Sequence, residues 1–290
     1  MPRFDTPRPI TINVDVVGNV RVNASDRDDT LVTIEPRDPS KSADVKAARD
    51  TVVEHTDGEL VVRTPKHWKR FTPFGGGESV DVTIEVPTGS RLEASTGFGD
   101  INTEGELGSC RVKTAMGHLR LDHTADLRAR TAFGDVTVDH VAGDADVSTS
   151  SGELRIGEIT GTAIVKNSNG PTEVAGVDGD ARVKSANGDI VLRRAGASTV
   201  AKSSNGDVRV LDVSAGTIVM ETAAGDLEAG VHQGVAAWLD LHTRFGTVRN
   251  DLDATEGPAP SDGKVEVRAT TSAGDIVIRR ATGTRAPAID

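Results

Sequence analysis

Aspartate follows a recurring glycine at several points of the chain, and the resulting row of carboxylates is a candidate cation site. Asp189, Asp207 and Asp226 are 18 and 19 residues apart. If successive turns of the chain stack like strands of a sheet, these carboxylates lie about 5 Å apart and repel one another unless water or a cation intervenes. A calcium-responsive fold is one hypothesis, although the G-G-x-G-x-D calcium repeat is not present. The simpler interpretation is that Gly-Asp satisfies turn geometry and the carboxylates are solvated.

Two further rows of ionisable residues are weaker candidates. A basic residue stands four positions before the glycine in five repeats: Lys113, Arg130, Lys166, Lys184 and Lys202. This row could bind an anionic polymer, but the acidic rows beside it favour a charge-balanced, solvated face. His123 and His140 occupy the same offset in neighbouring repeats, and two imidazoles are fewer than the three or four protein ligands typical of zinc. We therefore predict neither a metal site nor a cofactor.

Apolar side chains replace polar ones at one position of the early repeats. Phe98, Met116 and Phe133 directly precede the recurring glycine, where later repeats carry asparagine. If these three side chains are exposed, they form a contact surface; if they fold inward or under residues 65–78, they form a satellite core, which we favour. Together with Trp68 and Trp238 they make up our candidate interaction surface. Two structural roles suit the asparagines, a turn with positive φ or a ladder of stacked amides: Asn169, Asn187 and Asn205.

The sequence shows no constellation typical of catalysis. It contains no G-x-S-x-G elbow, Walker loop or H-E-x-x-H motif. Some solenoids are polysaccharide lyases or glycosidases, which need convergent carboxylates or a basic residue beside a sugar platform. Only Trp68 and Trp238 could supply an indole for such a platform, and tyrosine is absent. We predict a non-enzymatic protein without a small-molecule substrate; a carbohydrate-binding or carbohydrate-active β-helix protein is the alternative.

A period of about eighteen residues organises all of these rows. The phrase Ser, Thr or Asn, two variable residues, Gly, a polar residue and an aliphatic one recurs, as in TAFGDV, SANGDI and SSNGDV. Such a period predicts a solenoid, in which each coil buries its apolar face only by stacking on its neighbours. The expected fold is all-β, a parallel β-solenoid (β-helix) of about ten coils. The glycines that mark the coils most clearly are Gly99, Gly117, Gly134, Gly152, Gly170, Gly188, Gly206 and Gly225.

The apolar pattern within each repeat predicts where the chain turns. Apolar residues fall at odd offsets before the glycine and at even offsets after it. Because side chains alternate along a strand, this break in phase places a corner at the glycine. A second corner is expected nine residues later, at Gly143, Gly161 and Gly179.

The first part of the chain is rich in strand patterns but lacks the period. Residues 51–64 predict a hairpin with Asp57-Gly58 at its tip, and residues 36–50 predict a loop with a helical turn. Since an uncovered end coil exposes apolar surface and unpaired backbone groups, a solenoid needs a cap. The chain is thus expected to divide into an irregular β-rich cap at 1–90, continuous with solenoid repeats at 91–280, and a flexible tail at 281–290.

Composition excludes several classes of partner. The net charge of −11 opposes binding to nucleic acid or anionic lipid, because polyanions need a basic footprint. No window approaches the roughly 20 apolar residues of a membrane span, and no apolar signal-peptide core follows the first residues, so a cytoplasmic location is expected. Cys110 is the single cysteine and stands at an aliphatic position of the repeat, which predicts a buried, inert thiol.

The order of several motifs resembles one bacterial family. DGELVVRT, VTIEVPTGSRLEAST, the repeated TxxGDI phrases, AWLDLHTRFGTVRND and VRATTSAGDIVIRRA are similar to the DUF4097 family of β-strand repeat proteins, whose members carry the name "putative adhesin", and above all to its actinobacterial members. The resemblance covers nearly the whole chain. It implies a β-solenoid without an established enzymatic activity. Our hypothesis is a scaffold or protein-interaction module that binds a protein partner or associates with itself.

Overall fold

The computed structural model describes residues 1–65, 78–252 and 263–282. The chain forms two compact units, Met1–Ile156 and Gly157–Asp290, and strand β16 (Leu154–Ile159) contains the boundary between them. Regular structure in the described residues is almost entirely strand, as predicted. None of the described helical structure is long and apolar enough to cross a membrane.

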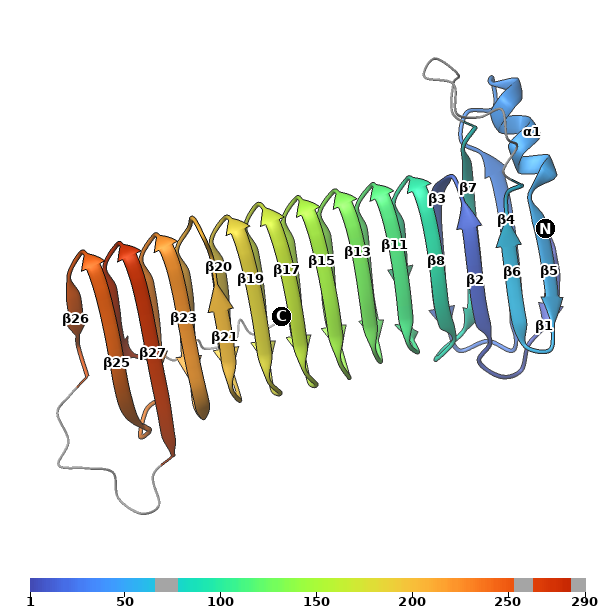
Figure 1. Ribbon diagram of the computed structural model, residues 1–290. Helices are drawn as coiled ribbons and strands as arrows, with labels where there is room; N and C mark the ends of the chain where they lie inside the picture. The colour runs from blue at the N-terminus through green and yellow to red at the C-terminus, as the bar shows by residue number, and fades with distance from the viewer. Residues whose placement is uncertain (66–77, 253–262, 283–290) are drawn as a thin grey trace. The chain divides into compact units, whose positions relative to one another are not determined.

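The first unit is built from two sheets, whose strands run side by side in Figure 1. One sheet contains, in order of neighbours, β1 (Arg3–Asp5), β4 (Asp29–Pro36), β7 (Val80–Pro87), β3 (Gly18–Ser25), β9 (Ile101–Glu104), β12 (Leu119–Thr124) and β14 (Val136–Val141), with β10 (Glu106–Leu107) also beside β12. The other contains β5 (Val52–Thr56), β6 (Glu59–Arg63), β2 (Thr11–Val16), β8 (Arg91–Phe98), β11 (Cys110–Met116), β13 (Leu127–Phe133) and β15 (Ala145–Ser151).

Coils of this unit begin before the sequence repeat becomes visible. Strands β2 and β3 meet at Gly18, whose φ of 136° matches that of the later corner glycines. β2 pairs in parallel with both β6 and β8, and β3 pairs in parallel with both β7 and β9. The described strands between β3 and β8 therefore lie on the outer side of this first coil, where β4 pairs antiparallel with β7 and β5 pairs antiparallel with β6.

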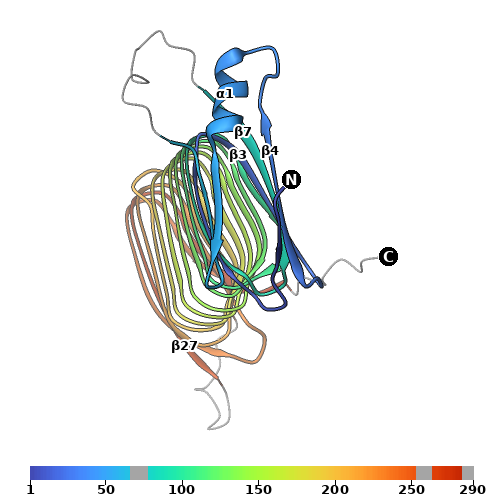
Figure 2. The same cartoon turned by 90° about the vertical axis from the view of Figure 1, so that its right-hand side faces the viewer.

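Two local predictions for this N-terminal region are confirmed. β5 and β6 form an antiparallel hairpin, with Asp57 at φ 51° and Gly58 at φ 77° in its turn. Helix α1 (Ser42–Asp50) packs against β4 and β7 at the end of the unit (Figure 2). Its buried Asp44 accepts backbone N–H bonds from Asp38 and Ser79, at 3.1 and 3.0 Å, which attach the helix to the preceding loop and to the start of β7.

The second unit continues the same construction. One sheet contains β18 (Thr172–Val177), β20 (Ile190–Ala195), β22 (Val208–Val213), β24 (Leu227–Val231), β28 (Ile276–Arg280) and β26 (Val248–Asn250). The other contains β17 (Ala163–Asn169), β19 (Ala181–Asn187), β21 (Thr199–Lys202), β23 (Gly216–Ala224), β27 (Lys264–Ala273) and β25 (Ala236–Phe245).

The last two coils of this unit are stacked in the reverse of their sequence order. β27 pairs with β23 on one side and with β25 on the other, and β28 likewise lies between β24 and β26. The coil that comes last in the sequence is therefore inserted, and β25 with β26 forms the end of the stack (Figure 1). This insertion explains why the spacing between corner glycines becomes longer near the C-terminus.

The recurring glycine is confirmed as a corner, and the reason is steric. Gly188 has a φ of 141°, and a Cβ on it would lie 2.1 Å from the carbonyl oxygen of Gly170 in the neighbouring coil. A side chain is excluded by both the backbone conformation and the close approach. The second predicted corner is also found, since Gly143 and Gly179 each lie between two consecutive strands.

Inward rows of small aliphatic side chains form the core. Val165 pairs with Val183, Val183 with Ala201, and Ala201 with Met220, and all four are buried. A residue in such a row is enclosed only when coils stack on both sides of it, so burial depends on the neighbours.

Candidate functional site

The row of aspartates after the corner glycine is used to join coils. The Oδ1 atom of Asp189 accepts the backbone N–H of Asp207 at 2.9 Å, and Asp207 accepts that of Asp226 at 2.9 Å. Asp226 in turn accepts the backbone N–H of Asp275 at 2.8 Å. The carboxylates are thus hydrogen-bonded as well as exposed, which goes beyond the simple solvated turn that we expected.

Asp275, the last aspartate of this row, shows how these hydrogen bonds change the pKa of a carboxylate. The backbone N–H of Thr247, and then its hydroxyl, lower the pKa of Asp275 from its ordinary value, because both stabilise the ionised form. Each carboxylate of this row accepts a backbone N–H that stabilises its ionised form. Within the described ranges, no group of three or more His, Cys, Asp or Glu side chains is arranged to hold a metal ion.

The predicted approach of two histidines is confirmed, but they remain a pair. His123 and His140 occupy paired positions of β12 and β14, with ring centroids 5.5 Å apart. His123 Nδ1 lies 2.5 Å from the carboxylate of Asp122. This arrangement is a surface contact between adjacent coils.

The asparagines before the glycine form the amide ladder that was one of their two predicted roles. Asn187 Nδ2 donates to Asn169 Oδ1 at 3.0 Å, and Asn205 Nδ2 donates to Asn187 Oδ1 at 3.0 Å. The prediction of positive φ for them is wrong, because Asp57 is the only non-glycine residue with positive φ in the described part of the chain. At these corners the positive φ is confined to the glycine.

The apolar strip, defined as Phe98, Met116 and Phe133, lies at this same corner position in the first unit. Met116 pairs in register with Phe98 on one side and with Phe133 on the other. The side chains are 60%, 46% and 58% exposed, respectively. Our preference for a satellite core is therefore wrong. At the corner the side chains of these strands no longer point into the core, so the strip faces outward. Sequence alone could not decide this, because a phase break does not say which way the corner residue points.

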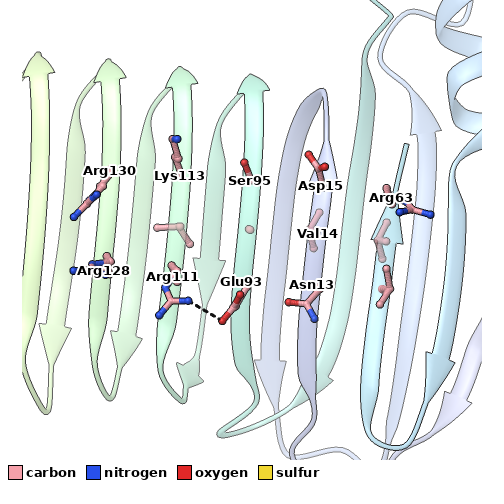
Figure 3. A pocket seen from close by; sticks show the side chains of 14 residues that line it. Asn13, Val14, Asp15, Arg63, Glu93, Ser95, Arg111, Lys113, Arg128 and Arg130 are labelled. Carbon is pink, nitrogen blue, oxygen red and sulfur yellow. Dashed lines mark hydrogen bonds and ion pairs between the residues drawn. The ribbon is translucent and has the colours of Figure 1, made fainter. Parts of the chain in front are cut away.

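Next to the strip, the same strands form a shallow groove, shown in Figure 3. It has a volume of about 720 Å³ and extends over the outer face of β6, β2, β8, β11 and β13. Its floor is the backbone of these strands at positions such as Val14 and Ala94, whose own side chains are buried in the core. Charged side chains rise from neighbouring strands above this floor: Asp15, Arg63, Glu93, Arg111, Lys113, Arg128 and Arg130.

The groove is cationic on an acidic protein. Five of those charged side chains are basic and two are acidic, whereas the whole chain has a net charge of −11. Arg111 pairs with Glu93 at 3.2 Å, and Arg128 and Arg130 share Asp146 at 3.1 and 3.4 Å. Lys113 has no carboxylate at ion-pair distance among the residues that the structure describes. These charges are solvated, and they remain available to an incoming anionic group.

Lys113 and Arg130 were part of the predicted basic row, but Arg111 and Arg128 were not singled out. The signal was present in the triplets Arg-Val-Lys at 111–113 and Arg-Ala-Arg at 128–130, which put two cations on one face of each strand. Only the stacking of β11 and β13 turns these triplets into one patch.

Of the two tryptophans in the predicted interaction surface, the structure describes Trp238. Trp238 lies on β25 in the second unit and is 58% exposed. Trp68 lies outside the described residues, as does the expected tail from residue 283 onward. Cys110 is buried, as predicted, and burial raises the pKa of its thiol to about 11.

The chain matches one family model and is distantly similar to several solved structures. The Toastrack DUF4097 family matches residues 8–279. No curated protein matches the sequence. Among solved structures, a "putative adhesin" from Parabacteroides distasonis is 13% identical, with 95% of each chain covered and a TM-score of 0.37. A "putative adhesin" from Bacteroides fragilis is 12% identical over 96% of this chain and 95% of that one, with a TM-score of 0.30. A "putative cell adhesion protein" from Clostridium sporogenes is 11% identical over 96% and 98%, with a TM-score of 0.19.

Proposed function

This chain belongs to the Toastrack DUF4097 family, and we propose that it is a non-enzymatic β-solenoid scaffold that binds a protein partner through the outer face of its first unit. The observation that carries the proposal is the apolar strip. Three large side chains stand in register on adjacent strands, and each is about half or more exposed. Large exposed apolar clusters on soluble proteins commonly mark contact sites.

The composition of the strip suits a protein contact. Phenylalanine and methionine are enriched at the centres of protein interfaces, where they are desolvated by the partner. Strand spacing places the outer members of the strip, Phe98 and Phe133, about 10 Å apart. This length accommodates one or two apolar side chains of a partner, with backbone rigidity supplied by the sheet.

The groove beside the strip indicates the charge of that partner. Arg111, Lys113, Arg128 and Arg130 would face acidic side chains, which their net positive field would attract from solution. We therefore propose a partner that presents acidic residues next to an apolar anchor. What supports a non-catalytic role is that the groove is a wide, shallow face on which Arg111, Arg128 and Arg130 are already ion-paired.

The test compares matched pairs of variants in affinity capture from the native host, followed by titration with the purified partner. F98S/F133S should abolish capture by removing the apolar anchor. K113E/R130E should weaken it by about tenfold or more, since it places like charges opposite the acidic partner. Affinity for the partner should fall as salt is added, because exposed charges are screened.

Control variants come from the second unit. K166E/K184E changes the same repeat positions on β17 and β19, and I164S removes an exposed apolar residue from β17. Both should retain binding. If a purified partner binds equally to F98S/F133S and to the wild type, the proposal is wrong. Binding of an acidic polysaccharide that is lost in K113E/R130E but kept in F98S/F133S would instead favour the carbohydrate-binding alternative.

A further inference from the structure

The terminal coil of the second unit, β25 with β26, has one open side. β25 pairs with β27 along its whole length, and no other strand in the described residues pairs with it. Its inward residues Leu239 and Leu241 pair with Val267 and Ala269, which are fully buried. The two leucines themselves are only half-buried. One side of this apolar row is therefore covered and the other is not.

Larger apolar side chains gather at the same coil. Trp238 is 58% exposed and Phe245 71% exposed, and Val248 on β26 is also exposed. Leu239 and Leu241 add the open side of the core row to this surface. Apolar side chains exposed at the end of a stack are unfavourable in water and are typical of a surface that a partner covers.

The strand edge lacks most of the features that normally prevent pairing, and its charged side chains, Asp240 and Arg244, are exposed on its outward face. β25 is ten residues long, and its sequence AAWLDLHTRF contains neither proline, glycine nor lysine. Its register with β27 is continuous from Ala236 to Thr243. Long, regular edges with unpaired backbone groups are templates for another strand, and proteins usually interrupt them with bulges, proline or charge.

We propose that this edge pairs with the same edge of a second copy of the chain. In this dimer the two β25 strands run antiparallel about a two-fold axis at Leu241. Because that residue belongs to the inward row, inward side chains of one copy lie opposite inward side chains of the other. Leu241 then meets its own counterpart, and Leu239 lies opposite Thr243. The two open core rows cover each other.

The outward face of β25 is self-complementary in this register. Asp240 lies opposite His242 of the second copy, and Trp238 lies opposite Arg244. Asp240 and Arg244 are also diagonal neighbours across the pair, within reach of long side chains. Opposite charges, and a cation beside an indole ring, therefore meet twice in each dimer. A two-fold interface requires this self-complementarity, since the same patch serves both copies.

A second copy joined through its own β25 fits better than one joined through its N-terminal edges. Those edges, in the first unit, are β1 with three residues and β5 with five. Each would leave about half or more of the ten-residue β25 unpaired. Arg3 of β1 is already paired with Asp29 at 2.8 Å. The length mismatch favours a closed dimer over an open head-to-tail filament.

Charge reversal tests the register. Sedimentation analysis over a range of concentrations should show a monomer–dimer equilibrium for the wild-type chain. R244D brings a second carboxylate close to Asp240 of the other copy, and D240R brings two arginines together, so each should weaken dimerisation by about tenfold or more. D240R/R244D restores opposite charges and should recover most of the affinity. Simple damage to the strand could not produce this recovery, which protects the test against misfolded variants.

A covalent readout gives a second, independent check. L241C in a C110S background places one thiol of each copy at the two-fold axis, and mild oxidation should yield a disulfide-linked dimer. C110S alone should yield none. The proposal fails if the wild type is monomeric at all concentrations, if D240R/R244D is no better than the single variants, or if assembly continues into larger species. K113E/R130E should dimerise normally, so this result is independent of the proposed binding groove.

Discussion

Individual residues of the repeated phrase each make a bond or contact between coils. The hydroxyl of Thr131, three positions before the glycine, donates to the carbonyl of Gly117 in the adjacent coil at 3.2 Å. Gly134 itself lies so close to Gly117 that a Cβ would come within 2.1 Å of that carbonyl oxygen. Asp135, directly after the glycine, accepts the backbone N–H of Glu153 at 2.8 Å. The phrase that looked most like ligand chemistry is therefore explained by the stacking of the coils.

Cys110 supports a prediction about alkaline pH. It lies in an inward row between Leu92 and Leu127, is 4% exposed, and has its thiol pKa raised by burial from 9.0 to about 11. The unfolded chain ionises this thiol first, so the folded state loses relative stability as pH rises from 9 towards 11. One pH unit above the unfolded pKa, the loss in free energy of unfolding should be about 1.4 kcal/mol.

Urea unfolding of the wild type and C110A at pH 8 and pH 10 measures this contribution. The difference in unfolding free energy between the two proteins should shrink at the higher pH, because the variant has no thiol to ionise. Other titrating groups cancel in the comparison. Parallel pH dependence in both proteins would contradict the assigned pKa.

At the scale of elements, the corner decides whether two strands become a coil. The phase break in the apolar pattern predicted its place correctly, because alternation of side chains is a local property of a strand. The outward orientation of the apolar strip was not predictable in this way. It depends on how far β8, β11 and β13 extend past their last inward threonines, which are held by bonds to the neighbouring coil's glycine carbonyls.

Gly188 to alanine should be among the most damaging single changes to a coil. It combines a positive φ with a backbone oxygen 2.1 Å from the new Cβ, so we expect a loss of about 3 kcal/mol or more. Thermal and urea unfolding would measure it. Gly97 to alanine is the matched control, since nothing lies within 4 Å of its Cβ position and its φ is not in the left-handed region. Similar destabilisation by both changes would show that the corner geometry is not the cause.

At the scale of the whole molecule, the burial of each coil depends on which coils lie beside it. In the second unit, β27 and β28 come last in the sequence but are covered on both sides. β25 and β26 precede them and lie at the end. This order also places Trp238 and Phe245 on the open face.

Hydrogen exchange should reveal that order directly. At a concentration where the chain is monomeric, amides of 236–250 should exchange faster than those of 264–280, because strands at an end have unpaired backbone groups and less burial. Mass spectrometry of peptides from the two segments provides the measurement. Faster exchange in 264–280 would mean that the coils stack in their sequence order.

The sequence by itself determined the coil: its period, its corner glycines, its inward rows, the N-terminal hairpin and the burial of Cys110. These follow from alternation and steric exclusion, which act over a few residues. Only the tertiary structure decided the inserted order of the last coils, the exposure of Phe98, Met116 and Phe133, and the donors that occupy the aspartates. Each of these depends on which coil lies beside which, and a repeating sequence offers nearly equivalent neighbours, so stacking of the whole chain has to choose among them.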